Sequence, residues 1–137
     1  MSGESYIPKE NPSDLKYTKD HEWAKLEGDI AVVGITDFAQ HQLTDIVFVE
    51  LPKIGKETIQ GKSFTVVESV KSVSDVFAPV SGTVVEVNSE LEANSALVNH
   101  DAFGKGWIAK IKLKDSGELN KLMSAEEYSK YIQTAGH

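Results

Sequence analysis

The chain carries near its centre the stretch ESVKSVSDVFAPVSG, which runs from Glu68 to Gly82. An apolar run (residues 64–70) leads into this stretch, and a second run (residues 73–77) leaves it toward a proline and glycine turn. Two strand-like runs around a short polar segment predict a β-hairpin with Lys71 at its tip. The small neighbours Ser69 and Ser72 leave the amine open to a modifying enzyme. An ordinary solvated surface lysine is the alternative, since no Asn-Gly or Asp-Gly turn adjoins it.

The segments on either side of this hairpin predict further strands. They are rich in Val, Ile and aromatic residues and comprise Trp23 and residues 30–35, 46–51, 83–87 and 107–113. Glycine and proline interrupt them at short intervals, which is typical of antiparallel strands rather than helix-linked parallel ones. The fold class is therefore mainly β, and a doubly wound fold is disfavoured.

One strand shows which side of it faces the core. Residues 107–113 alternate, with Ala109, Ile111 and Leu113 on one face and lysines on the other, so we expect the apolar face to cover the core.

Helices are few and short. Thr36 or Asp37 can cap one that runs to Leu43, and residues 118–123 predict another with Leu119, Leu122 and Met123 on one face. The sequence Ser124-Ala125-Glu126-Glu127 is a capping-box pattern that opens a C-terminal helix carrying Tyr128, Tyr131 and Ile132. We expect these helices at the periphery of the sheets.

The length of 137 residues and the mass of 15.0 kDa fit one domain. Residues 1–14 are polar, with two prolines, and predict a flexible N-terminal tail, so the single domain spans residues 15–137. The apolar runs are far shorter than the roughly 20 residues that a membrane helix needs. Neither a signal core nor a transit-peptide pattern opens the chain. We expect a cytoplasmic protein, with the mitochondrial matrix after processing as the alternative.

The composition excludes several classes of function. The net charge is −7, and all 14 basic residues are lysines, so phosphate backbones would repel the chain and nucleic-acid binding is excluded. Cysteine is absent, so any thiol chemistry must come from an attached group.

Several enzyme motifs nearly occur and fail on their context. Gly55 with Gly61-Lys62-Ser63 imitates a phosphate-binding loop, but the spacing is wrong and a strand follows. Residues 104–109 match a loose dinucleotide fingerprint but precede a strand, which predicts a turn. The four histidines have no metal-ligand spacing, and no G-x-S-x-G elbow occurs. We expect no catalytic residues and no metal.

A resemblance to a known family rests on successive blocks of the chain, in order and spacing. The blocks are Thr18–Trp23, Gly34–Gln40, Asp45–Pro52, Val67–Ser72, Ala78–Gly82, Val98-Asn99, Gly106-Trp107 and Ser124–Tyr128. Over residues 15–132 the chain resembles the glycine cleavage H-protein family of lipoyl carriers. It departs from the family at Thr44, where glycine is usual, and at His100 and Ala102.

The resemblance implies a barrel-sandwich hybrid, the lipoyl- and biotinyl-carrier fold of two antiparallel sheets. It implies lipoate covalently attached to Lys71, within a motif flanked by Glu68, Ser69, Val70 and Ser72. The family's arm-docking residues correspond here to Glu22, Asp75 and Asp20. The attached dithiolane would then supply the sulfurs that the chain lacks.

The resemblance also implies partners. The carrier would take the aminomethyl group of glycine from the pyridoxal-phosphate glycine decarboxylase to the tetrahydrofolate-dependent aminomethyltransferase. Dihydrolipoamide dehydrogenase would then reoxidise it. A lipoyl or octanoyl transferase or a lipoate ligase would attach the cofactor, and we expect the carrier to be a monomer.

Three alternatives stay open at the level of sequence. A lipoyl or biotinyl module of a larger enzyme is disfavoured. Biotin is not expected, because Lys71 lies between Val70 and Ser72 rather than between methionines. Such modules also lack the Trp23 block and the C-terminal helices. A lipoyl depot that donates its lipoate to 2-oxo-acid dehydrogenase complexes fits the same residues equally well, and the last alternative is a β-sandwich with an unmodified lysine.

Overall fold

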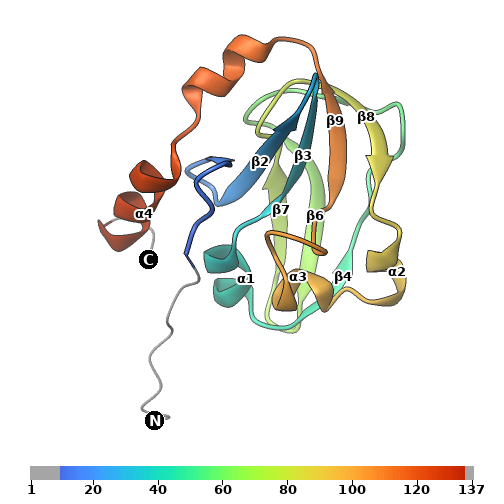
Figure 1. The fold of residues 1–137 in the computed structure, drawn as a ribbon. Coiled ribbons are helices and arrows are strands. Elements are labelled where there is room, and N and C mark those ends of the chain that lie inside the picture. Colours follow the sequence, from blue (N-terminus) through green and yellow to red (C-terminus); the bar gives the residue numbers. More distant parts are fainter. Residues whose placement is uncertain (1–9, 135–137) are drawn as a thin grey trace.

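The structure of the chain is a computed structural model that describes residues 10–134. Its strands form two antiparallel sheets, drawn in Figure 1. The six-stranded sheet has the order β1 (Lys16–Tyr17), β2 (Glu22–Glu27), β3 (Ile30–Ile35), β9 (Ala109–Leu113), β8 (Gly82–Val87) and β5 (Glu57–Thr58). The three-stranded sheet has the order β4 (Ile46–Val49), β6 (Ser63–Ser69) and β7 (Val73–Phe77). The predicted class, mainly β with two antiparallel sheets, is confirmed.

The predicted strands all occur, with small differences in extent. β4 ends at Val49 rather than at residue 51, because the chain turns away toward Pro52. β9 begins at Ala109, two residues after the predicted start, and residues 104–106 form the predicted turn. β1 and β5 were not predicted. Each has only two residues, too few for an alternating pattern to show.

The main core lies between the sheets and contains side chains from both of them. Val33, Val84 and Ile111 come from the six-stranded sheet, and Val67 and Val76 come from the three-stranded sheet. In β9, Ala109 and Ile111 are buried and Leu113 packs against the same cluster. The face predicted from the alternation of residues 107–113 is therefore the core face.

Three short helices connect the strands. α1 (Asp37–Leu43) begins after Thr36, whose Oγ1 accepts a hydrogen bond from the Ala39 amide at 3.1 Å, so Thr36 is the cap. α2 (Glu90–Ala93) and α3 (Leu97–His100) were not predicted, because each is a single turn with little periodicity.

The predicted helix over residues 118–123 is wrong in type and extent. The segment is the 3₁₀ helix η1 (Ser116–Lys121), capped by the Asp115 carboxylate on the Gly117 amide at 2.9 Å. Met123 cannot belong to a helix, because its backbone exchanges two hydrogen bonds with the backbone of Tyr17. The tertiary pairing with β1 thus ends the helix early.

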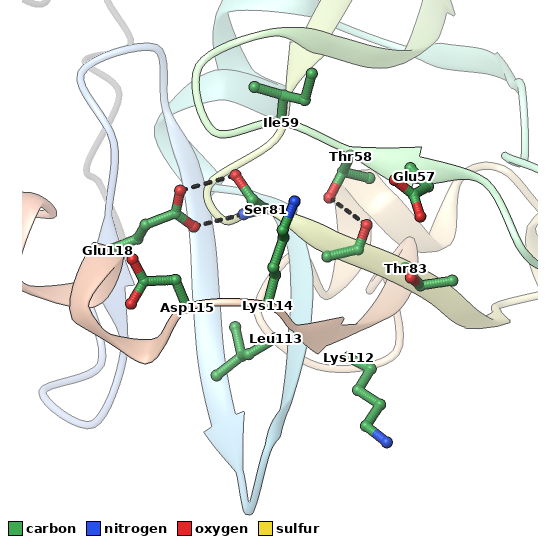
Figure 2. A pocket seen from close by; sticks show the side chains of 11 residues that line it. Glu57, Thr58, Ile59, Ser81, Thr83, Lys112, Leu113, Lys114, Asp115 and Glu118 are labelled. Atoms are coloured by element: carbon green, nitrogen blue, oxygen red, sulfur yellow. Dashed lines mark hydrogen bonds between the residues drawn. The ribbon is translucent and has the colours of Figure 1, made fainter.

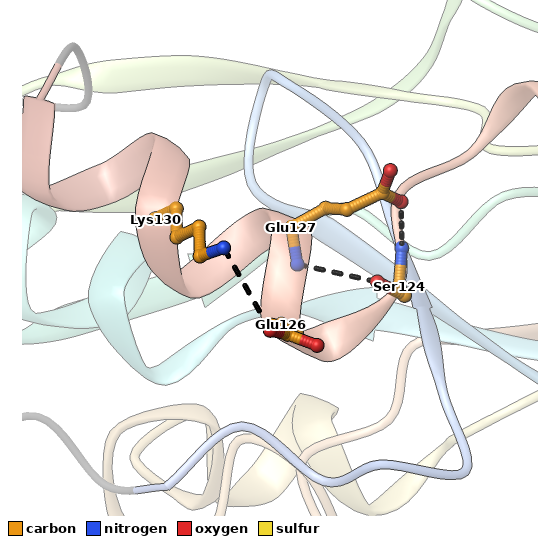
Figure 3. Close-up of polar contacts among 4 residues, drawn as sticks. All are labelled: Ser124, Glu126, Glu127 and Lys130. Carbon is orange, nitrogen blue, oxygen red and sulfur yellow. Dashed lines mark hydrogen bonds and ion pairs between the residues drawn. The ribbon is translucent and has the colours of Figure 1, made fainter.

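The C-terminal helix α4 (Ala125–Thr134) starts with the predicted capping box, shown in Figure 3. The Glu127 amide donates to Ser124 Oγ at 3.2 Å, and the Ser124 amide donates to Glu127 Oε1 at 2.9 Å. In Figure 1, α4 lies beside the N-terminal segment of the described chain. A second apolar cluster, which includes Tyr17, Trp23 and Tyr128, joins this helix to the sheet.

The N-terminal tail and the domain boundary stay predictions. Residues 1–9 lie outside the described part of the chain, as does His137. In the described part of the chain, Asn11 donates a hydrogen bond to Ser129 Oγ of α4 at 2.9 Å, and the Tyr17 hydroxyl donates one to the carbonyl of Pro12 at 2.6 Å. The final residues of the predicted tail therefore contact the domain.

Two kinds of feature are absent from residues 10–134. No helix in this range is long and apolar enough to cross a membrane. No group of three histidine, aspartate or glutamate side chains in the same range is arranged to hold a metal ion.

Candidate functional site

Lys71 lies in the turn that connects β6 to β7, where its side chain is exposed. The turn is closed by the Ser69 amide, which donates to the carbonyl of Ser72 at 2.8 Å. Ser69 Oγ accepts hydrogen bonds from the amides of Lys71 at 3.1 Å and Ser72 at 3.0 Å. This serine hydroxyl satisfies the backbone of the tip, so the hairpin needs no Asn-Gly pair.

The hairpin tip is tied to the loop that precedes β4. The Val70 amide donates to the carbonyl of Asp45 at 3.0 Å, and Lys71 Nζ lies 3.4 Å from the carbonyl of Gln42 near the end of α1. The second contact is long and exposed, so it holds the amine weakly. The backbone of the tip is therefore fixed while the amine can move.

Asn99 of α3 fixes this supporting loop. Its Oδ1 accepts from the Ile46 amide at 2.9 Å, and its Nδ2 donates to the carbonyl of Thr44 and to Gln40 Oε1, both at 2.9 Å. The sequence singled out Asn99 only as part of a family block. Its role becomes visible when the fold brings α3 next to the end of α1.

Thr44 has a φ of 66° and a ψ of −150°, a conformation that favours glycine. A β-branched side chain is strained there, because its Cβ meets the neighbouring backbone. The departure from the family's usual glycine at this position therefore falls in the loop that supports the lysine hairpin.

Glu22 is the most deeply buried of the predicted site residues, with 1% of its surface exposed. Its carboxylate accepts hydrogen bonds from the Thr18 hydroxyl at 2.5 Å and from the Phe77 amide at 3.1 Å. Burial raises the pKa of Glu22 to about 7, although both hydrogen bonds favour the ionised form. This carboxyl group can thus change its protonation near neutral pH.

A cavity of about 430 Å³ opens beside Glu22. Asp20 and Glu22 line it, together with the apolar side chains of Phe77 and Met123 and the ring of Tyr131. Its wall is thus mainly apolar, and the two carboxyl groups share it with Lys19 and Lys121.

Asp75 lies outside this cavity, exposed in the middle of β7, where its carboxylate accepts a hydrogen bond from Ser63 Oγ at 2.8 Å. The strand begins two residues after Lys71 and ends at Phe77, whose amide binds Glu22. From Lys71, β7 thus leads past Asp75 to Phe77, which contacts Glu22 of β2. The structure brings Asp20 and Glu22 to one cavity and leaves Asp75 on the path toward it.

The sequence did not predict how α4 supports this cavity. The Tyr131 hydroxyl donates to the carbonyl of Lys19 at 3.0 Å, and the Tyr128 hydroxyl lies 2.8 Å from His21 Nδ1 and 2.7 Å from Thr36 Oγ1. The contacts with Lys19 and His21 hold the turn that leads into Glu22. The spacing of the two tyrosines was the signal for a helix face, but it did not reveal the partners of the hydroxyls.

A larger cavity of about 800 Å³ is shown in Figure 2. It lies among β5, β8, β9 and η1, and none of the predicted site residues lines it. Its most ordered feature is Glu118, whose carboxylate accepts from the amide and the hydroxyl of Ser81, both at 2.7 Å. Since these bonds join η1 to the start of β8, we assign Glu118 a structural role.

Two antiparallel sheets that display a lysine on a tight hairpin define the barrel-sandwich hybrid, the fold of lipoyl carriers. The glycine cleavage H-protein family matches residues 15–135 of this chain. The chain therefore belongs to the glycine cleavage H-protein family, the lipoyl carriers of the glycine cleavage system.

Individual relatives agree with this assignment. The chain is 54% identical over 125 residues to the glycine cleavage system H protein of Carboxydothermus hydrogenoformans, covering 91% of this chain and 96% of that protein. It is 55% identical over 122 residues to that of Halothermothrix orenii, covering 89% and 95%. The crystal structure of a glycine cleavage system H protein from Mycobacterium marinum is similar at a TM-score of 0.80 and 39% identity, covering 93% of this chain and all of that one. The resemblance read from the sequence blocks is confirmed.

Proposed function

We propose that this chain is lipoylated on Lys71 and carries the aminomethyl group of glycine from glycine decarboxylase to the aminomethyltransferase. Dihydrolipoamide dehydrogenase then reoxidises the carrier. The observation that supports this most directly is the exposed amine on the fixed backbone of the β6–β7 turn. The chain itself provides no catalytic residue in this scheme. We place it in the cytoplasm, because the similar proteins come from bacteria. We expect it to act as a monomer.

The attachment needs an activated lipoyl group, which a ligase or a transferase supplies. Lys71 Nζ loses a proton, attacks the lipoyl carbonyl carbon and loses a second proton as the amide bond forms. The bond to the activating group breaks, and its electron pair leaves with that group. The product has no charge at this position. Only the weak contact with the Gln42 carbonyl is lost, so attachment costs the fold little.

When bound, lipoate supplies a disulfide that is reduced as it accepts the aminomethyl group. The residues of the chain decide where the loaded arm rests. From Val73, two residues after Lys71, to Phe77 the strand spans roughly 13 Å at the rise of a β-strand, so an arm attached to Lys71 would extend along β7 toward Phe77. Its end would then reach the cavity beside Glu22.

The residues around that cavity suit a protonated amine on an apolar chain. Glu22 offers a buried carboxylate, and a cation beside it would favour its ionised form. Asp75 offers a second carboxylate on the way, and Asp20 a third at the cavity wall. The apolar side chains of Phe77 and Met123 would exclude water, which slows hydrolysis of the cargo.

The attachment site is tested by intact mass. The protein is incubated with a lipoate ligase, ATP and lipoate, and compared with Lys71→Arg and with the control Lys53→Arg, another exposed lysine. We expect one lipoyl increment in the wild type and in the control and none in Lys71→Arg. Unfolding free energies should agree within about 0.5 kcal/mol, as is usual for surface substitutions. An increment on Lys71→Arg would refute the site.

The resting place of the arm is tested separately. Lipoylated protein is loaded with methylamine, and ammonia release is followed without the transferase for the wild type, Glu22→Gln, Asp75→Asn and Asp20→Asn. We expect faster release from Glu22→Gln and Asp75→Asn and a smaller change for Asp20→Asn. The exposed Glu57→Gln is the control and should behave as the wild type. Equal rates in all variants would show that the protective residues lie elsewhere.

A further inference from the structure

The outer face of the three-stranded sheet carries a cluster of exposed apolar side chains beside Lys71. Four of the eight large apolar side chains that are exposed in the described residues lie here: Val47 (54%), Phe48 (48%), Val70 (68%) and Val73 (65%). Exposed apolar residues normally occur singly, and a group of them marks an interaction surface. We call these four residues the apolar patch.

The strand register places two residues of the patch in one row. Phe48 pairs with Glu68, and Glu68 pairs with Val73, so these three side chains form one row on the same face of the sheet. Val70 lies directly after the end of β6, in the turn that carries Lys71. Val47 lies at the irregularity of β4, next to Phe48.

The opposite face of the same strands is already used by the core. Val49, Val67 and Val76 are buried there between the two sheets. The patch is thus not needed to close the core. Its residues have strand-forming side chains, but a strand face exposed to water is usually polar, with serine, threonine or charged residues.

The position of the patch beside Lys71 indicates which kind of enzyme would bind it. The unmodified Lys71 amine extends only one lysine side chain from the hairpin backbone, whereas the end of a lipoyl arm lies much farther away. An enzyme that acts on the end of the arm can work at a distance from the sheet. An enzyme that acylates the amine must place its active site against the hairpin itself, and therefore against Val70 and Val73.

We infer that the apolar patch is the docking surface for the enzyme that transfers lipoate to this chain. The inference rests on the proposed attachment at Lys71. The enzyme would present an apolar surface around the mouth of its acyl site. It would also present a lysine or arginine opposite Glu68, because that carboxylate lies between Phe48 and Val73 and would otherwise lose its solvation unpaired.

The rigid tip adds to this role. The Ser69 hydroxyl and the Asp45 carbonyl hold the backbone of the turn, so docking on the neighbouring strands presents the backbone of Lys71 at a defined distance. A preformed surface loses little conformational entropy when it binds.

The test compares matched pairs of polar substitutions. The double variant Phe48→Ser/Val73→Thr changes the patch, and Ile54→Ser/Val85→Thr changes two exposed apolar residues outside it. Lipoylation by a lipoate ligase with lipoate and ATP is followed by intact mass over a range of carrier concentrations. Thermal unfolding midpoints are recorded for both variants.

We expect the patch variant to lose about tenfold in kcat/KM through a higher KM, the size of effect that interface anchors have. Its kcat at saturation and its unfolding midpoint should stay near those of the control, which should react within twofold of the wild type. Equal kcat/KM in patch and control variants would refute the docking surface while leaving the site intact. A wild type that gains no lipoyl group would instead refute the proposed function.

Discussion

Thr44 is strained in the loop that supports the lysine hairpin, because its φ of 66° and ψ of −150° suit glycine. We predict that Thr44→Gly raises the free energy of unfolding by about 1 kcal/mol, since the relief of strain exceeds the entropy that glycine adds to the unfolded chain. The free energy of unfolding is measured by urea denaturation. The control Thr83→Gly removes a threonine from the interior of β8, and it should lower stability. A loss of stability in Thr44→Gly would contradict the assignment of strain.

Also at the residue scale, the raised pKa of Glu22 predicts that the stability of the protein depends on pH. Its pKa is about 7 in the folded protein against an ordinary 4.5, so the folded state holds the proton more tightly than the unfolded chain. The stability from this group is complete below pH 4.5 and is lost as the pH rises through 7, by up to about 3 kcal/mol.

Glu22→Gln should remove that slope, because glutamine does not titrate. Denaturation curves between pH 5 and 8 would show a flatter profile for Glu22→Gln than for the wild type. The exposed Glu27→Gln on the same strand should keep the wild-type profile. Parallel profiles for the wild type and Glu22→Gln would mean that the carboxyl group does not titrate in this range.

At the scale of elements, the capping box stabilises the start of α4. The helix then holds the loop before Glu22 through the contact of Tyr131 with Lys19. Ser124→Ala should destabilise the protein by about 1 kcal/mol, the usual cost of losing an N-cap. Ser89→Ala is a matched control, since Ser89 precedes α2 but its side chain makes no cap hydrogen bond. Differential scanning calorimetry should give a midpoint about 4 °C lower for Ser124→Ala and an unchanged one for Ser89→Ala. Equal midpoints would show that α4 does not need the cap.

At the scale of the whole molecule, the net charge of −7 predicts electrostatically steered encounters. Glu68 and Asp75 flank the lysine along the two hairpin strands, so partners with basic rims should be attracted to this end. We expect the rate at which glycine decarboxylase loads the lipoylated carrier, below saturation, to fall severalfold between about 0.01 M and 0.15 M salt. Free lipoamide has no such charge and is the control substrate. A loading rate that salt does not change would exclude steering.

Much of this protein could be predicted from its sequence because local patterns carry the information. Alternation in residues 107–113 identified the core face of β9, and the capping box identified the start of α4. The hairpin at Lys71 follows from two apolar runs around a short polar segment. The lack of cysteine and arginine led to the expectation that the chain has no thiol chemistry of its own and does not bind nucleic acid.

The remaining features depend on contacts between distant residues, which no local pattern reports. η1 ends early because Met123 pairs with Tyr17, and Asn99 supports the hairpin only because α3 packs next to α1. Burial raises the pKa of Glu22. The carboxyl group lies against β7, where it binds the amide of Phe77, a residue 55 positions away in the chain. Local propensity and hydrophobic period decided which strands form and where the lysine is displayed. Only the packing of the two sheets and α4 decided the environment of the carboxyl groups, because desolvation depends on what surrounds a residue in space.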